Sequence, residues 1–275
     1  MLNRNVYGGW LLLAWLMPAL PVHAQAKSEE ITMTNTAQLK ASALQGLQNK
    51  LVVFGHQSIG DNLVNGLQRL AEQADVKLAI QEQRTASASK GVSHFYIGEN
   101  GNPASKIQDF AATIDAGAGQ GADLALMKLC YADFNATSDG RQLATNYIDS
   151  LEALAKRHPQ TAFVAVTAPL MAAQTGPKAW IKRFLGRQPS GYLDNVRRAE
   201  FNAMLRDKYQ SSGRLFDLAR LESQASASSC TVSVDGQVVE ALCPEFTDDG
   251  GHLNERGQAM MASAFLNFVS SFSAK

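Results

Sequence analysis

The chain contains little cysteine, little proline and no excess charge of either sign. Three cysteines among 275 residues are too few for a disulfide-dense scaffold, and eight prolines exclude a proline-rich or collagen-like chain. Lysine and arginine together number 25, and so do aspartate and glutamate. A chain with zero net charge offers no overall basic field, which argues against nucleic acid and against an anionic membrane as partners.

Closely spaced metal-ligating residues are also missing. Metal sites usually need three or four ligands at recognisable spacings, such as H-E-x-x-H. His56, His94 and His158 are scattered along the chain, and none belongs to such a pattern. We therefore expect neither a metal nor another cofactor.

A long apolar run occurs only at the start of the chain. Arg4 precedes an apolar segment at residues 10–20, and Val22-His23-Ala24 follows as a small-x-small cleavage site. This pattern predicts a signal peptide over residues 1–24 and export to the periplasm or beyond the cell. An uncleaved anchor is the alternative, but prolines interrupt the run, and it is shorter than the ~20 residues of a membrane span. We expect residues 25–275 to form one domain, without a stable membrane span after cleavage.

The cysteines predict one disulfide and one free thiol. Cys230 and Cys243 flank a segment that carries the hairpin signal Asp235-Gly236. A hairpin brings its ends together, and an exported protein is in an oxidising environment, so we expect these two cysteines to be bonded. Two free thiols are the alternative. The hairpin is expected as a small insertion at about 224–247, and Cys130, within an apolar run, is expected to be a buried free thiol.

Apolar runs with strand character alternate with segments of helical periodicity. This alternation predicts an α/β fold, a three-layer α/β/α sandwich around a five-stranded, mostly parallel sheet. Ligands of such sheets bind at the carboxyl ends of the strands. Segments rich in glycine, serine, asparagine and proline are expected to be long loops at 83–104 and 172–192. The expected strands are 51–54, 76–80, 123–131, 162–166 and 215–218.

Ser58 follows the first expected strand and stands at the mouth of a helix. A helix N-terminus offers free backbone N–H groups and the positive end of the helix dipole. A serine there can present its hydroxyl as a nucleophile while its own N–H faces developing negative charge. The alternative is that Ser58 only caps the helix.

Asp249-Gly250-Gly251-His252 is the second notable pattern, and it precedes the last expected helix. An aspartate three residues before a histidine can bond the imidazole Nδ1 within one turn, which fixes the tautomer and supports the imidazolium. A solvated surface loop is the alternative reading of these four residues.

Together these features resemble the SGNH hydrolases, the broad family of GDSL-type esterases and lipases. Phe54 to Gly60 stands where that family carries its nucleophilic serine, and Asp249 to His252 matches its final D-x-x-H block. The resemblance covers essentially the whole chain after residue 24 and implies a flavodoxin-like sheet. It also implies a triad in which Ser58 attacks an ester, His252 moves the proton and Asp249 holds His252. An α/β-hydrolase fits less well, because its G-x-S-x-G elbow and deep serine are absent.

Two departures from the family pattern concern the oxyanion hole. His56 and Gln57 replace the Gly-Asp before the serine, and Ala132 stands where the third block has an asparagine donor. The resemblance implies backbone donors at Ser58 and at Gly101, with Gly98 as the second match for that glycine. Loss of one oxyanion donor typically lowers the rate by about 10²–10³. Candidate substitutes for the missing donor are Asn135, Asn62, Gln57 and His56.

The resemblance predicts a serine esterase that hydrolyses a carboxylic ester through an acyl-enzyme. The expected signal peptide adds export, and we expect a monomer. Its expected substrate is a small-molecule or glycan ester, such as O-acetyl groups on an extracytoplasmic glycan. Two alternatives stay open at this stage. One is an O-acyltransferase that uses the same triad, and the other is a catalytically inactive periplasmic binding protein.

Overall fold

A six-stranded parallel sheet forms the centre of the unit Lys40–Lys275, in the order β2-β3-β1-β4-β5-β6. The computed structural model describes residues 38–224 and 229–272, so the expected signal peptide lies outside the described residues. β1 pairs in parallel with β3 on one side and with β4 on the other. The strands are β1 (Leu51–His56), β2 (Ile80–Glu82), β3 (Gly91–Tyr96), β4 (Leu124–Met127), β5 (Ala162–Val166) and β6 (Leu215–Phe216).

The α/β class and the parallel sheet are confirmed, but the expected number of five strands is wrong. β3 lies within the segment predicted to be a loop, and it is buried along almost its whole length. Its polar residues conceal the strand pattern. Ser93 is buried because it accepts from the side chain of Gln83, and His94 because its ring pairs with the ring of His56.

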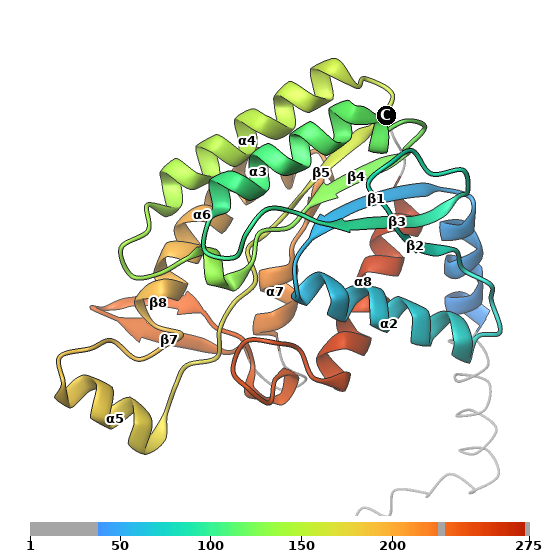
Figure 1. Ribbon diagram of the computed structural model, residues 1–275. Coiled ribbons are helices and arrows are strands. Elements are labelled where there is room, and N and C mark those ends of the chain that lie inside the picture. Colours follow the sequence, from blue (N-terminus) through green and yellow to red (C-terminus); the bar gives the residue numbers. More distant parts are fainter. Residues whose placement is uncertain (1–37, 225–228, 273–275) are drawn as a thin grey trace, which may run out of the picture. The chain divides into compact units, whose positions relative to one another are not determined.

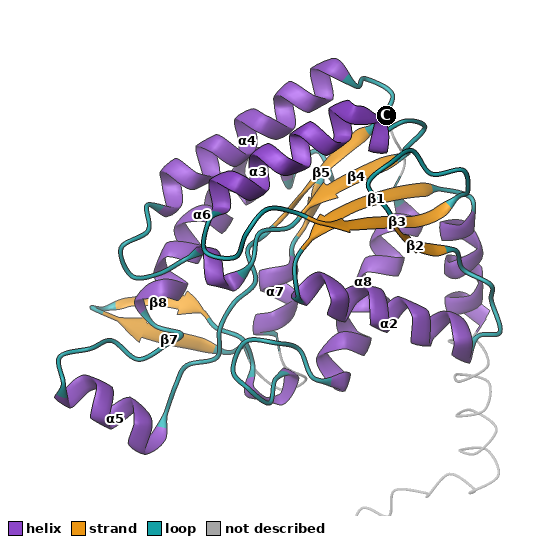
Figure 2. Cartoon of the chain, viewed as in Figure 1, coloured by secondary structure: helices purple, strands orange, loops and turns teal. Residues whose placement is uncertain are grey.

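Figure 2 shows helices on both sides of the central sheet. Successive residues of the central strands face opposite layers. Val52 and Phe54 of β1 pack against the layer that contains α2 and α8, whereas Leu51 and Val53 pack against the layer of α3, α4 and α6. Both faces of the sheet are therefore buried, as expected for a parallel sheet. The three-layer arrangement is visible in Figure 1.

Helices connect most of the strands, but β2 and β3 follow each other without a helix between them. A helical stretch at 40–48 comes before β1, and its Leu44 and Leu47 are buried in the core. α5 lies in the segment 172–192, which the sequence predicted to be a loop. The remaining helices are α2 (Ile59–Gln73), α3 (Pro103–Thr113), α4 (Gly140–Arg157), α5 (Gly176–Phe184), α6 (Leu193–Tyr209), α7 (Leu218–Ser223) and α8 (Glu255–Ser271), with short helices η1 (Ile114–Ala118), η2 (Tyr131–Asp133) and η3 (Pro244–Phe246).

A two-stranded hairpin lies in the segment predicted as an insertion. It consists of β7 (Thr231–Val234) and β8 (Gln237–Glu240), which pair in antiparallel register. Cys230 and Cys243 at its two ends form the expected disulfide, and Cys130 is a buried free thiol. Within the described ranges, no helix combines the length and the hydropathy that a membrane span requires.

Candidate active site

Ser58 is the N-cap residue of α2, two residues after β1 ends. Its side chain makes no capping hydrogen bond, so the simple capping role is not what the structure contains. The close turn from β1 into α2 requires glycine at Gly60, because a Cβ there would stand 2.1 Å from the ring of His56. The serine hydroxyl therefore lies at the carboxyl edge of the sheet, beside the first N–H groups of a helix.

Asp249 and His252 form a direct pair in the loop before α8. Asp249 Oδ2 lies 2.7 Å from His252 Nδ1, and Oδ1 accepts the backbone N–H groups of Gly251 and His252 at 2.8 Å each. Burial raises the pKa of Asp249, but these hydrogen bonds outweigh it and lower the pKa to about 2. The carboxylate is therefore charged at neutral pH, and it fixes the proton of the neutral imidazole on Nδ1. His252 Nε2 is left as the proton acceptor.

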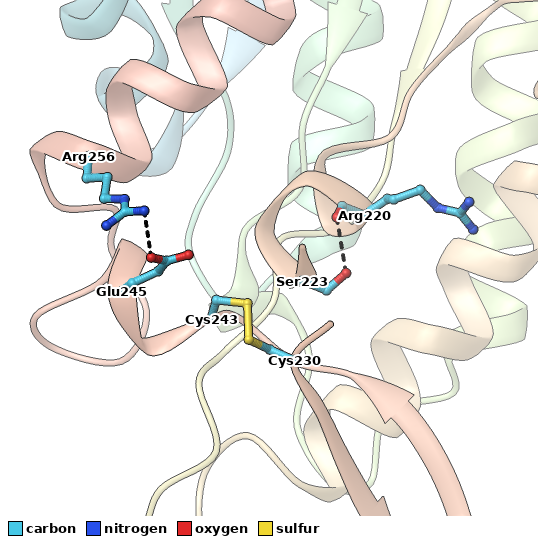
Figure 3. Close-up of a disulfide and its surroundings, with 6 residues drawn as sticks. All are labelled: Arg220, Ser223, Cys230, Cys243, Glu245 and Arg256. Atoms are coloured by element: carbon cyan, nitrogen blue, oxygen red, sulfur yellow. Dashed lines mark hydrogen bonds and ion pairs between the residues drawn. A yellow bond between two sulfur atoms is a disulfide. The ribbon is translucent and has the colours of Figure 1, made fainter. Parts of the chain in front are cut away.

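The disulfide anchors the chain just before this loop (Figure 3). The backbone N–H of Cys243 donates to Glu222 at 2.9 Å, and that of Cys230 donates to Ser223 at 2.7 Å, so both halves of the cystine are tied to α7. Beyond Cys243, an ion pair of 2.8 Å joins Glu245 to Arg256 of α8. The segment that carries Asp249 is thus held at both ends.

Two consecutive residues, Cys130 and Tyr131, contact Ser58 and His252 respectively. Ser58 Oγ lies 3.8 Å from Cys130 Sγ, and the Tyr131 hydroxyl lies 3.3 Å from His252 Nε2. Asn62, one turn after Ser58, accepts the backbone N–H of Leu253 at 3.2 Å. Within the described part of the chain, no hydrogen bond joins Ser58 directly to His252. The serine and the Asp–His pair therefore share one neighbourhood, with the tyrosine hydroxyl on the imidazole nitrogen that a nucleophilic serine would need.

A buried ion pair holds the backbone next to this group of residues. Lys106 Nζ lies 2.8 Å from both carboxylate oxygens of Asp133, and both side chains are completely buried. The same carboxylate accepts the backbone N–H of Cys130 at 2.6 Å and that of Gly101 at 3.0 Å. The backbone N–H of Gly101, which was expected to bind the oxyanion, therefore donates to Asp133 instead.

Two of the four proposed substitute donors have their donor groups engaged elsewhere. Gln57 donates both hydrogens of its amide, to the carbonyls of Ile97 and Gly98 at 2.8 and 3.0 Å. His56 is fully buried and pairs with the ring of His94 at 3.0 Å. Asn135 and Asn62 each use only the amide oxygen, which accepts from Thr137 and from the N–H of Leu253, so these contacts do not occupy their N–H groups. The N–H of Gly98, the second match for the family glycine, donates to Asp109 at 2.8 Å.

Asn100 carries a side-chain amide that the sequence analysis did not single out. Its Oδ1 accepts from Lys106 Nζ at 2.8 Å. Because an ammonium group only donates, the carbonyl end of the amide must face Lys106, and the two N–H groups must point the other way. Asn100 itself is exposed, so those N–H groups are not buried in the core. No periodicity or motif marked this residue, because its orientation depends on a lysine six positions further along.

Two buried side chains, Arg198 and Glu222, hold backbone segments near the candidate site. Arg198 is almost completely buried, and its guanidinium donates to the carbonyl of Tyr131 at 2.7 Å. Glu222 is completely buried, and its carboxyl accepts the N–H of Leu170 at 2.6 Å. Burial raises the pKa of Glu222 to about 8, so this group is largely protonated at neutral pH. The Arg198 contact fixes the backbone that carries the tyrosine hydroxyl, and the Glu222 contact fixes that of Leu170.

A pocket of about 200 Å³ opens beside Asp249. Its volume is below the roughly 300–1,000 Å³ of sites for drug-sized ligands, so it suits a small group. Among the described residues no group of three or more metal-ligating side chains is placed to hold a metal ion. The pocket is lined by Met171, Ala172, Ala173, Gln174, Ser190, Asp249 and Gly250.

Comparison with known proteins yields similarities of fold alone. No family model and no curated protein sequence matches the chain. Esterase EstA from Pseudoalteromonas is 12% identical, with 79% of this chain and 95% of that chain covered and a TM-score of 0.43. The periplasmic domain of a lipopolysaccharide acetyltransferase from Salmonella is 11% identical, with 79% and 82% covered and a TM-score of 0.44. A GDSL-like lipase structure from Parabacteroides merdae is 9% identical, with 81% and 96% covered and a TM-score of 0.45.

Proposed function

We propose that this chain is an exported serine esterase of the SGNH type, with Ser58 as nucleophile, His252 as general base and Asp249 as the group that orients the base. The observation that carries the proposal is the 2.7 Å contact between Asp249 and His252 Nδ1, which leaves Nε2 as a proton acceptor in the neighbourhood of Ser58. A serine at a helix N-terminus, a charged aspartate and a neutral imidazole are the parts that acyl transfer requires.

In the resting arrangement the Tyr131 hydroxyl occupies Nε2 of His252. Catalytic hydrogen bonds are often long or misaligned in free enzymes and tighten only when substrate binds. We infer that the ester displaces the tyrosine contact, after which Ser58 Oγ attacks the carbonyl carbon and His252 Nε2 takes the hydroxyl proton. The imidazolium then returns that proton to the leaving alkoxide. Water attacks the resulting acyl-enzyme in the same manner, which releases the acid and restores the serine.

The oxyanion of the tetrahedral intermediate needs donors, and the proposal assigns two. The first is the backbone N–H of Ser58, at the positive end of the α2 dipole. The second is the side-chain amide of Asn100, which Lys106 holds by its carbonyl end. This assignment fills the place left by Ala132, since the N–H of Gly101 is bonded to Asp133.

The substrate class follows from the small pocket and from the expected export. A space of about 200 Å³ beside Asp249 suits a short acyl group such as acetyl. Gln174 and Ser190 supply polar contacts there, which favours an ester on a polar carrier. We therefore propose O-acetyl groups of an extracytoplasmic glycan as the substrate, with no cofactor and no second chain required.

The proposal is tested by hydrolysis of 4-nitrophenyl acetate. We expect the wild-type protein to turn over the ester and Ser58→Ala to abolish turnover above the rate of the buffer alone. Ser89→Ala, in an exposed loop, is the matched control and should keep the wild-type rate. Equal rates for wild type and Ser58→Ala would remove Ser58 as the nucleophile.

A further inference from the structure

The helix α5 leaves a continuous apolar side uncovered. Trp180, Ile181, Phe184 and the following Leu185 are between 49% and 76% exposed, and they fall on one side of the helix through the spacing i, i+1, i+4, i+5. Trp180 stacks on Phe184 with ring centroids 5.6 Å apart. Soluble proteins rarely expose four large apolar side chains together, and such patches mark interaction surfaces.

The same segment is strongly basic. From residue 171 to residue 193 the sequence contains four basic residues and no acidic one. The zero net charge of the whole chain conceals this local excess, which is why composition alone argued against an anionic surface. The basic residues are Lys178, Lys182, Arg183 and Arg187.

The fold holds α5 out from the rest of the unit. Figure 1 shows α5 at the outer end of two connecting segments, away from the central sheet. Gln174 and Ser190 close the base of this excursion, because the N–H of Gln174 donates to the carbonyl of Ser190 at 3.0 Å. Both residues also line the pocket beside Asp249. The segment that carries α5 therefore also borders the candidate active site, so a surface bound by α5 would lie close to that site.

We propose that α5 docks on an anionic phospholipid surface, with the four apolar side chains in the acyl boundary and the exposed Lys178 and Arg187 against the headgroups. Short helices with tryptophan and phenylalanine on one side and lysine or arginine around it bind membranes in this way. Charge argues against a second copy of the chain as the occupant, since two such faces would bring their basic residues together. Docking does not depend on the proposed esterase activity.

The test uses the full chain with Trp10→Phe and Trp15→Phe, which leaves Trp180 as the single tryptophan. We expect its emission to shift to the blue with phosphatidylglycerol vesicles, and brominated lipid to quench it. Lys178→Glu with Arg187→Glu should weaken the apparent affinity by about tenfold or more, because each basic residue near the surface contributes. The charge-matched control Lys77→Glu with Lys156→Glu, both exposed and outside α5, should bind as the parent does.

Three results would overturn the proposal. The first is Trp180 emission that does not change with anionic vesicles, even if the expected signal peptide at residues 1–24 attaches the chain to them. The second is a variant with both Lys178→Glu and Arg187→Glu whose emission shifts with the same apparent affinity for vesicles as that of the parent. The third is a shift that appears without vesicles as protein concentration rises, which would assign the face to self-association.

Discussion

Lys106 and Asp133 form an ion pair in which the ammonium lies 2.8 Å from both carboxylate oxygens and neither side chain is exposed to solvent. The pair stands between the loop after β3 and the loop after β4. Through the N–H groups of Gly101 and Cys130 the carboxylate fixes both loops. Through Asn100 the ammonium aims an amide. One buried pair therefore fixes the backbone of Cys130, whose thiol contacts Ser58, and the orientation of the Asn100 amide.

Removal of one partner of this pair should be strongly destabilising. We expect Lys106→Met to lower the free energy of unfolding by about 3–5 kcal/mol, because it leaves the Asp133 carboxylate buried without its counter-ion. Lys90→Met breaks the exposed pair with Asp123 and is the matched control, with an expected loss below about 1 kcal/mol. Urea denaturation followed by circular dichroism measures both values. Similar losses for the two variants would mean that the buried pair has no special structural role.

Asn100 should act on turnover and not on substrate binding. We expect Asn100→Ala to lower kcat by about 10²–10³ while KM changes little, since an oxyanion donor acts in the transition state. Asn100→Asp keeps an oxygen toward Lys106 but has no donor, so its kcat should fall by a similar factor. Asn135→Ala removes an exposed asparagine from a local turn and should keep the wild-type kcat. Wild-type kcat in Asn100→Ala would contradict the oxyanion role and leave the triad assignment intact.

Asp249 should contribute no ionisation to the acid side of the pH profile. Burial raises the pKa of Asp249, yet hydrogen bonds from His252 and the loop backbone lower it to about 2. From about pH 4 to 7 the carboxylate therefore stays charged, so its protonation should not limit turnover. We expect Asp249 to add no unit of slope to log kcat/KM in this range. A unit of slope that disappears in Asp249→Asn would show that this carboxyl is protonated there.

The neighbouring acids Asp248 and Asp249 provide an internal comparison. Asp249→Asn should lower kcat by about 10⁴-fold, because an amide cannot hold the imidazole in the required tautomer. Asp248→Asn should have little effect, since the side chain of Asp248 contacts Asn254 at 3.3 Å and not His252. Equal kcat values for the two variants would place the orienting carboxylate elsewhere.

His56 should make stability depend on pH. Burial, followed by the charges of Lys128 and His94, lowers the pKa of His56 from 6.5 to about 3. Between these values the unfolded chain binds a proton that the folded chain does not, so stability is present above pH 6.5 and is lost as the pH falls toward 3. The expected slope is about 1 kcal/mol per pH unit. His56→Gln should flatten it, whereas His158→Gln, next to Asp115 on the surface, should not.

Much of the fold could be predicted from local sequence. Leu51 to Phe54 and Ala162 to Val166 are short apolar runs bounded by polar residues, which is the pattern of strands buried on both faces. β3 escaped detection because Ser93 and His94 are polar, and their burial depends on partners far away in the sequence. Tertiary contacts of this kind leave no local signal.

The candidate site likewise contains one contact that the sequence predicted and several that it did not. The Asp249–His252 contact spans three residues, so spacing and two glycines predicted its geometry. The contacts of Cys130 and Tyr131 with Ser58 and His252 join segments 72 and 121 residues apart, and no spacing rule anticipates them. The loss of the Gly101 N–H to Asp133 has the same origin. Pairing over long separations decides which donors remain available.

Covalent labelling with a fluorophosphonate probe tests the central claim most directly, because it reports the nucleophile without knowledge of the natural ester. We expect one adduct on the folded wild-type protein, found on Ser58 by peptide mass spectrometry. Ser58→Ala should give no adduct, and His252→Ala should be labelled far more slowly, because the hydroxyl loses its base. Absence of an adduct on the folded wild-type protein, or an adduct on another residue with Ser58→Ala labelled as before, would contradict the assignment of this chain as a serine esterase acting through Ser58.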